Sequence, residues 1–164
     1  MARRAIDWVE PHDNPAGVVY GTLIIGAVLA TESARRETLL ETVGATVVAL
    51  LLYWLAHSYA ATLGDRLDRQ VPLTAGAVAN SLVRDRAIVR GALVPILVLL
   101  IASGLGSSLT TAVSISVWAS AVTIVAFEVL AGVRAELEGK ELFVQVCAGA
   151  VMGLAIIALR TLLH

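Results

Sequence analysis

The feature that most constrains this chain is a stretch from Gly91 to Phe127 that contains no charged residue. At about 1.5 Å per residue, a helix of this length is nearly twice as long as the roughly 30 Å hydrocarbon core of a bilayer. The stretch therefore predicts two successive membrane spans. The segment from Gly104 to Ser108 predicts the turn between them, because glycine and serine favour turn conformations over a continuous helix.

The composition points to the same class of protein. Hydrophobic residues make up 58% of the chain and charged residues only 15%, with a mean hydropathy of +0.84, whereas soluble domains carry roughly a quarter charged residues. Long charge-free blocks alternate with short charged ones, as expected of spans and loops. We therefore predict an all-α, polytopic membrane helix bundle that forms a single domain, residues 1–164. The only cysteine, Cys147, excludes an intrachain disulfide.

The apolar segments predict about five transmembrane helices, with four as the alternative. The first begins after the capping residues Asp13 and Asn14, and Pro15 suits its first turn, where a missing N–H removes no hydrogen bond. The third is the questionable one, because it places Arg90 inside the membrane; if it lies at the interface, four spans remain. The predicted spans cover about residues 15–34, 42–64, 86–104, 109–130 and 142–163.

The positive charges predict the orientation. With a cytoplasmic N-terminus, nine of the twelve Lys and Arg residues lie inside and three outside, as the positive-inside rule requires. The inside set is Arg3, Arg4, Arg66, Arg69, Arg84, Arg86, Arg90, Arg134 and Lys140, and the outside set is Arg35, Arg36 and Arg160. The largest loop, about residues 65–85, is then cytoplasmic, and a short helix after Pro72 is expected to lead into the third span.

Three segments resemble a known group of proteins. They are the segment from Val19 to Ala30, the segment from Tyr53 to Leu67 that contains Trp-Leu-Ala-His, and the C-terminal segment from Ala158 to His164. In these segments the chain is similar to a family of small, uncharacterised actinobacterial multi-pass integral membrane proteins. The resemblance implies a membrane topology and no particular activity.

Ionisable residues inside the predicted spans define the candidate site, because such groups are costly in a bilayer and often mark a functional position. At about 1.5 Å per residue, His57 and Arg90 lie roughly 6 and 7 Å to the cytoplasmic side of the middle of their spans. The antiparallel hairpin brings Glu128 within reach of Arg90. These three residues, with Tyr53 and Thr123 as hydrogen-bonding neighbours, form the predicted polar cluster.

Proline and glycine positions predict local packing. Pro95 is expected to kink the third span, because proline lacks an N–H and leaves the carbonyl of Gly91 without its helical partner. A GxxxG spacing puts two glycines on one helix face, where a neighbouring helix can approach closely. The two pairs are Gly17 with Gly21 and Gly149 with Gly153.

Each polar residue also has a simpler structural interpretation. Arg90 can extend its apolar stem toward the cytoplasmic headgroups, with Glu128 as a partner at a helix end. His57 can bond a single backbone carbonyl. The glycine pairs can be ordinary helix contacts.

The sequence excludes the familiar enzyme motifs. It contains no phosphate-binding glycine loop, HExxH, GxSxG or catalytically spaced carboxylate pair, so we expect no catalytic residues, no metal site, no cofactor and no nucleic-acid partner. The polar cluster and the small-residue faces favour a homo-oligomeric channel or transporter for an ion or small solute in the plasma membrane. The alternative is a non-transporting protein that binds a partner or supports an assembly through the loop 65–85.

Overall fold

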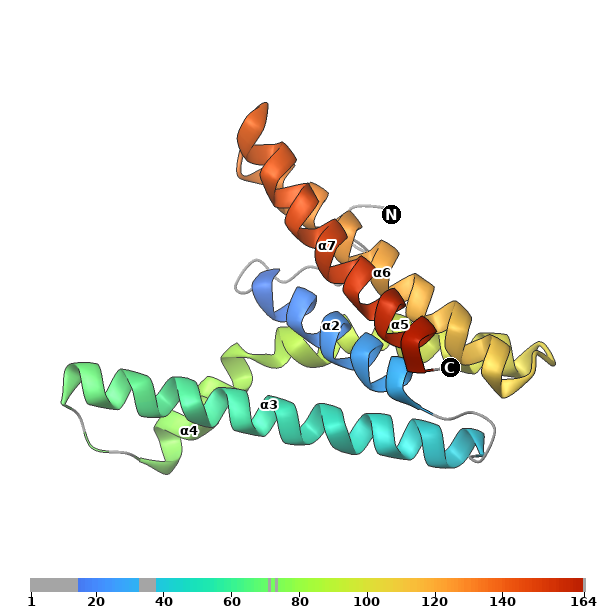
Figure 1. Ribbon diagram of the computed structural model, residues 1–164. Helices are drawn as coiled ribbons and strands as arrows, with labels where there is room; N and C mark the ends of the chain where they lie inside the picture. Colours follow the sequence, from blue (N-terminus) through green and yellow to red (C-terminus); the bar gives the residue numbers. More distant parts are fainter. Residues whose placement is uncertain (1–14, 33–37, 71, 73, 164) are drawn as a thin grey trace, which may run out of the picture.

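The computed structural model describes residues 15–32, 38–70, 72 and 74–163, and this part of the chain is helical, without a strand. Figure 1 shows the arrangement of the helices. They are α2 (Pro15–Thr31), α3 (Leu39–Arg69), α4 (Ala75–Arg84), α5 (Arg86–Gly104), α6 (Leu109–Arg134) and α7 (Lys140–Leu163). The all-α helix bundle predicted from the sequence is confirmed.

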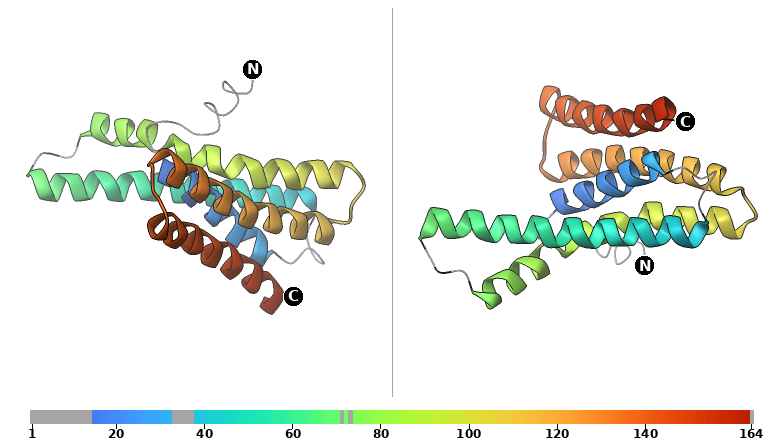
Figure 2. Two further views of the ribbon diagram at one scale, coloured as in Figure 1. Left: turned by 90° about the horizontal axis from the view of Figure 1, so that it is seen from above. Right: turned by 60° about the horizontal axis from the view of Figure 1, so that its bottom comes forward.

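Among the described helices, α3, α5, α6 and α7 are long and apolar enough to cross a membrane, which makes this a multi-pass membrane protein. The fifth apolar helix, α2, has 17 residues, or about 25 Å of helix against a hydrocarbon core of roughly 30 Å. Figures 1 and 2 show α2 between α3 on one side and α6 and α7 on the other. Of the five predicted spans, the first is therefore the one whose described helix is shortest for a bilayer. The third, α5, has many buried residues.

The helices alternate in direction. The start of α2, the end of α3, the helix α4, the start of α5 and the α6–α7 connection lie toward one end of the molecule. The end of α2, the start of α3, the α5–α6 turn and the end of α7 lie toward the other (Figure 2). Contacts between distant residues agree, because Ser58 meets Asp85 at the first end and Arg160 meets Glu32 at the second. On the predicted orientation, the first end is cytoplasmic.

The helix α3 begins with a capping box, in which Thr38 Oγ1 accepts from the Glu41 N–H and the Glu41 carboxylate accepts from the Thr38 N–H. It packs on the bundle through a narrow row of buried residues, Thr42, Thr46, Leu50, Ser58 and Thr62, which recur every fourth position or a multiple of it. Most of its remaining apolar side chains are exposed, as expected of a helix bordered by lipid.

The predicted loop 65–85 is mostly helical. The helix α3 continues to Arg69, and α4 covers Ala75–Arg84, with Thr74 capping it by accepting from the Ala77 N–H. The apolar pattern of a span ends near Gly64, but charged residues are good helix formers in water, so the helix extends past the predicted boundary. The last turns of α3 and α4 form a hairpin that extends beyond the other helices (Figure 2).

The helices α2 and α5 cross where a glycine of each helix lies against the backbone of the other. A Cβ atom built on Gly21 would overlap the carbonyl of Ile88, and one built on Gly91 would overlap the carbonyl of Val18. Thr22 Oγ1 lies 2.9 Å from both the Gly91 and the Val18 carbonyl oxygens and shares its single proton between them. The carbonyl that Pro95 leaves without a helical partner is therefore bonded by the neighbouring helix.

The helices α6 and α7 pack antiparallel through the second glycine pair. Gly149 lies against the side chain of Glu128, and Gly153 lies against Ala121. Of the two GxxxG pairs, Gly21, Gly149 and Gly153 lie against neighbouring helices, and Gly17 is buried. The turn between α5 and α6 falls at the predicted residues and includes Gly106 with a φ of 87°, a left-handed conformation that glycine adopts without strain.

Candidate functional site

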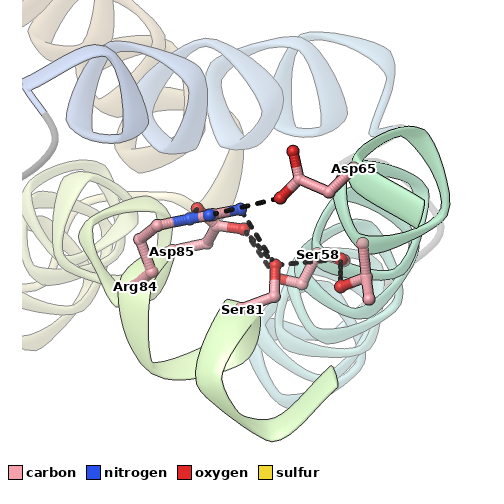
Figure 3. A network of polar contacts seen from close by, with 6 residues as sticks. Ser58, Asp65, Ser81, Arg84 and Asp85 are labelled. Carbon is pink, nitrogen blue, oxygen red and sulfur yellow. Dashed lines mark hydrogen bonds and ion pairs between the residues drawn. The ribbon is translucent and has the colours of Figure 1, made fainter. Parts of the chain in front are cut away.

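A buried carboxylate network that was not predicted fastens α3 to the junction of α4 and α5 (Figure 3). Asp85 is only 3% exposed, and one of its carboxylate oxygens accepts from Ser58 Oγ at 3.0 Å and lies 3.4 Å from Ser81 Oγ. Ser81 Oγ also lies 3.0 Å from the Ser58 carbonyl oxygen. We call this the Asp85 network; its members are Ser58, Thr62, Asp65, Ser81, Arg84 and Asp85.

Arg84 supplies the positive charge of the Asp85 network. Its guanidinium lies 3.6 Å from the other Asp85 carboxylate oxygen and 3.8 Å from the Asp65 carboxylate, and it donates to Ser81 Oγ at 3.2 Å. Arg84 and Asp65 are about half exposed, so solvent screens their ion pair. The Asp85 network therefore joins α3 to α4 through a buried carboxylate and two buried hydroxyls.

Sequence reasoning missed this network because Asp85 falls at the end of a predicted loop. An aspartate just before a helix is usually a cap, accepting from backbone N–H groups of the first turn. Asp85 precedes α5 but makes no such side-chain bond, and its carboxylate turns to α3 instead. Ser58 was identifiable as a membrane-embedded hydroxyl, but its partner required the fold of α4.

The predicted polar cluster divides into two groups. His57 stacks on Tyr53 of the same helix, with ring centroids 5.8 Å apart, and lies 5.8 Å from the ring of Tyr20 on α2. Tyr20 was not among the predicted site residues, although an aromatic ring one turn into the first span was a visible signal. His57 therefore joins α3 to α2 through aromatic contacts.

Arg90, Thr123 and Glu128 do not join His57 directly. Within the described residues, no ion pair or hydrogen bond connects Arg90 with Glu128 or with His57. Arg90 and Thr123 are both half-buried, on α5 and α6. Glu128 lies near the C-terminal end of α6, and its side chain lies against Gly149 of α7.

Glu128 and Tyr20 line a partly open cavity of about 340 Å³ between α2, α6 and α7. The Glu128 side chain lies across Gly149, where an added Cβ would be 2.6 Å from its Cγ. Gln145 Nε2 donates to the Glu128 carbonyl oxygen at 3.1 Å. We call this the Glu128 cavity; it is lined by Ala16, Val19, Tyr20, Phe127, Glu128, Ala131, Gln145 and Met152.

The depth of the Glu128 cavity follows from helix geometry. With α6 crossing over about residues 109–130, Glu128 lies roughly 13 Å to the cytoplasmic side of the middle at about 1.5 Å per residue. Met152 lies near the middle of the predicted last span. On the predicted spans and orientation, the Glu128 cavity extends from the cytoplasmic boundary of the bilayer to about its centre.

Among the described residues, no three His, Cys, Asp or Glu side chains are grouped to hold a metal ion. Comparison with family models, with curated proteins and with solved structures finds no match for this chain. The resemblance to small actinobacterial membrane proteins stays a prediction, and function must be argued from the cavity and its residues.

Proposed function

We propose that this protein is a small membrane transport protein of a bacterial plasma membrane, and that its solute binds in the Glu128 cavity. The observation that carries the proposal is a carboxylic acid that lines a cavity between α2 and the candidate membrane spans α6 and α7. An ionisable group at membrane depth is retained where it lines a substrate or ion pathway. The volume of about 340 Å³ lies within the range of about 300–1,000 Å³ typical of small-molecule sites.

The position of the cavity favours a transporter over an open channel. On its outer side, α2 packs directly against α6 and α7, where a Cβ on Gly26 would lie 2.9 Å from the Ser120 Cβ and 3.1 Å from the Ile156 Cδ1. Ser120 is fully buried and Ile156 is 4% exposed. Packed side chains thus separate the cavity from the outer end of the bundle. Release of a solute to that side requires α2 to move relative to α6 and α7, as in alternating access.

Flux measurements test this proposal. Wild-type protein, Glu128→Gln and Glu141→Gln are reconstituted in liposomes and assayed for flux of protons, Na⁺, K⁺ and small amines. Glu141 is the matched control, because it is an exposed carboxylate at the start of α7, outside the cavity. We expect a flux in wild type and Glu141→Gln that Glu128→Gln lacks. Absence of every flux in wild type would remove the proposal.

We further propose that the protein assembles with copies of itself through α3. This helix buries a single row of residues and leaves large apolar side chains exposed, among them Val48 at 56%, Leu52 at 63% and Leu55 at 49%. In the proposed assembly, a second copy covers this face. A cysteine at Leu52, in a Cys147→Ser background, is expected to cross-link two copies in membranes; a strict monomer with full flux would exclude the assembly.

A second candidate function has one observation in its favour. The hairpin of α3 and α4 extends beyond the bundle (Figure 2) and exposes Leu67 at 70% and Val83 at 61%, as a partner-binding element would. A photocrosslinking residue at Leu67 tests this in cells. Capture of one defined protein, together with no flux in liposomes, would favour partner binding over transport.

A further inference from the structure

We infer that the Glu128 cavity selects an organic ammonium cation. The inference rests on the proposed function, since it names the class of solute for the same site by its charge and its weak hydration.

The charge of the cavity is set by one residue. Among the described lining residues, Glu128 is the one carboxylic acid, and none of them is a lysine, arginine or histidine. Within the described residues, no hydrogen bond or ion pair engages its carboxylate. A carboxylate at the edge of a low-dielectric region attracts a cation and repels an anion more strongly than in water. The cavity therefore favours a solute with one positive charge.

The other lining residues exclude a strongly hydrated metal ion. Ca²⁺ takes six to eight oxygen ligands and Mg²⁺ requires near-ideal octahedral geometry, whereas the lining provides one carboxylate, one amide and one phenol. The rest of the lining is apolar or aromatic: Ala16, Val19, Phe127, Ala131 and Met152. An alkylammonium group is weakly hydrated and is attracted to aromatic faces such as those of Tyr20 and Phe127.

The stem of Glu128 is positioned before a solute arrives. It lies against Gly149, where any larger residue would displace it, and Gln145 holds the backbone at the same residue. This arrangement lowers the entropic cost of binding, because the first part of the side chain needs no reordering. Gly149 therefore acts as a positioning residue for Glu128.

Binding of benzyltrimethylammonium to the protein in lipid nanodiscs tests the inference. We expect saturable binding to wild type and Glu141→Gln, and binding weaker by about tenfold or more in Glu128→Gln, since the cation loses its paired charge. Glu128→Asp should retain part of the affinity. Gly149→Ala keeps the carboxylate but displaces its stem, so it should weaken binding in a protein that elutes as wild type on size exclusion.

Several outcomes would overturn the inference: no binding to wild type, equal binding to Glu128→Gln, or equal binding of the anion benzenesulfonate. Equal loss in Glu141→Gln would assign the effect to surface charge and would also overturn it. Binding does not depend on flux, so the two proposals fail separately. Cation binding without any flux upholds this inference and removes the transport function, and flux without cation binding removes this inference alone.

Discussion

The crossing of α2 and α5 gives the sharpest prediction about stability, through the substitution Gly91→Ala. The added methyl group would overlap the Val18 carbonyl oxygen and lie 2.7 Å from its carbon and 2.8 Å from the Val18 Cα. All three atoms are backbone, so no side-chain rotation relieves the overlap. The two helices must separate by about 1.5 Å to reach ordinary contact distance.

The magnitude follows from what the separation disturbs. Val18, Thr22, Ile88 and Ala92 surround the contact and are at most 1% exposed, and overpacking such a site costs about 1–3 kcal/mol. The bond from Thr22 to the Gly91 carbonyl is lost as well, and an unsatisfied buried carbonyl costs about 1–3 kcal/mol. The better helix propensity of alanine offsets about 1 kcal/mol. We expect the free energy of unfolding to fall by about 1–5 kcal/mol.

The assay is reversible unfolding in mixed micelles, with Gly44→Ala as the matched control. Gly44 is also inside a helix, and nothing lies within 4 Å of a Cβ built on it, so this variant should be as stable as wild type or more stable by up to about 1 kcal/mol. If Gly91→Ala proved as stable as Gly44→Ala, the close backbone contact, and the α2–α5 crossing with it, would be refuted.

Three further predictions concern other parts of the fold. Ser58→Ala should lower the free energy of unfolding by about 1.5–3 kcal/mol, because a charge-assisted bond to Asp85 is lost. The double variant Ser58→Ala with Asp85→Ala should lower it by less than the sum of the two single variants. Additive losses would contradict the Asp85 network. Arg160→Met should lower it by about 1–3 kcal/mol, because the guanidinium donates to the Glu32 carbonyl at 2.7 Å at the end of α2; an effect no larger than that of the exposed Arg66→Met would contradict this role. In a Cys147→Ser background, a cysteine at Leu105 should react with an impermeant thiol reagent from outside the cell and one at Glu138 from the cytoplasm, and the reverse pattern would invert the topology.

The sequence predicted the elements of this fold well where hydrophobicity alone decides them. The bounds of α5, Arg86–Gly104, are those expected of the third span, because Arg86 and the Gly104 turn mark both ends. The end of α3 was missed, because a charged helix that leaves the membrane has no apolar signal. The helix α2 ends at Thr31, whereas the predicted span ran to about residue 34, which lies outside the described residues.

The candidate site was predicted in its residues more than in its contacts. Glu128 and His57 were found because ionisable groups are rare in spans, and Gly149 was found by its spacing. Their contacts were not predictable, because they depend on which helix faces meet. Glu128 lies against Gly149 of α7, and the ring of Tyr20 lies beside that of His57. The Gly91 carbonyl was the exception, because the chemistry of Pro95 requires some donor there, and the fold supplies Thr22.

The central claim is that the Glu128 cavity lies within the membrane and admits water and solute from the cytoplasmic end. The most direct measurement is the reaction of a charged, impermeant thiol reagent with a cysteine at Val19, which lines the cavity, in a Cys147→Ser background. A cysteine at Val122, which is 66% exposed on the outer surface of α6, is the control at lipid-facing depth. We predict that the Val19 cysteine reacts from the cytoplasmic side, that benzyltrimethylammonium protects it, and that the Val122 cysteine does not react. Equal reactivity at the two positions, or none at Val19, would contradict the account.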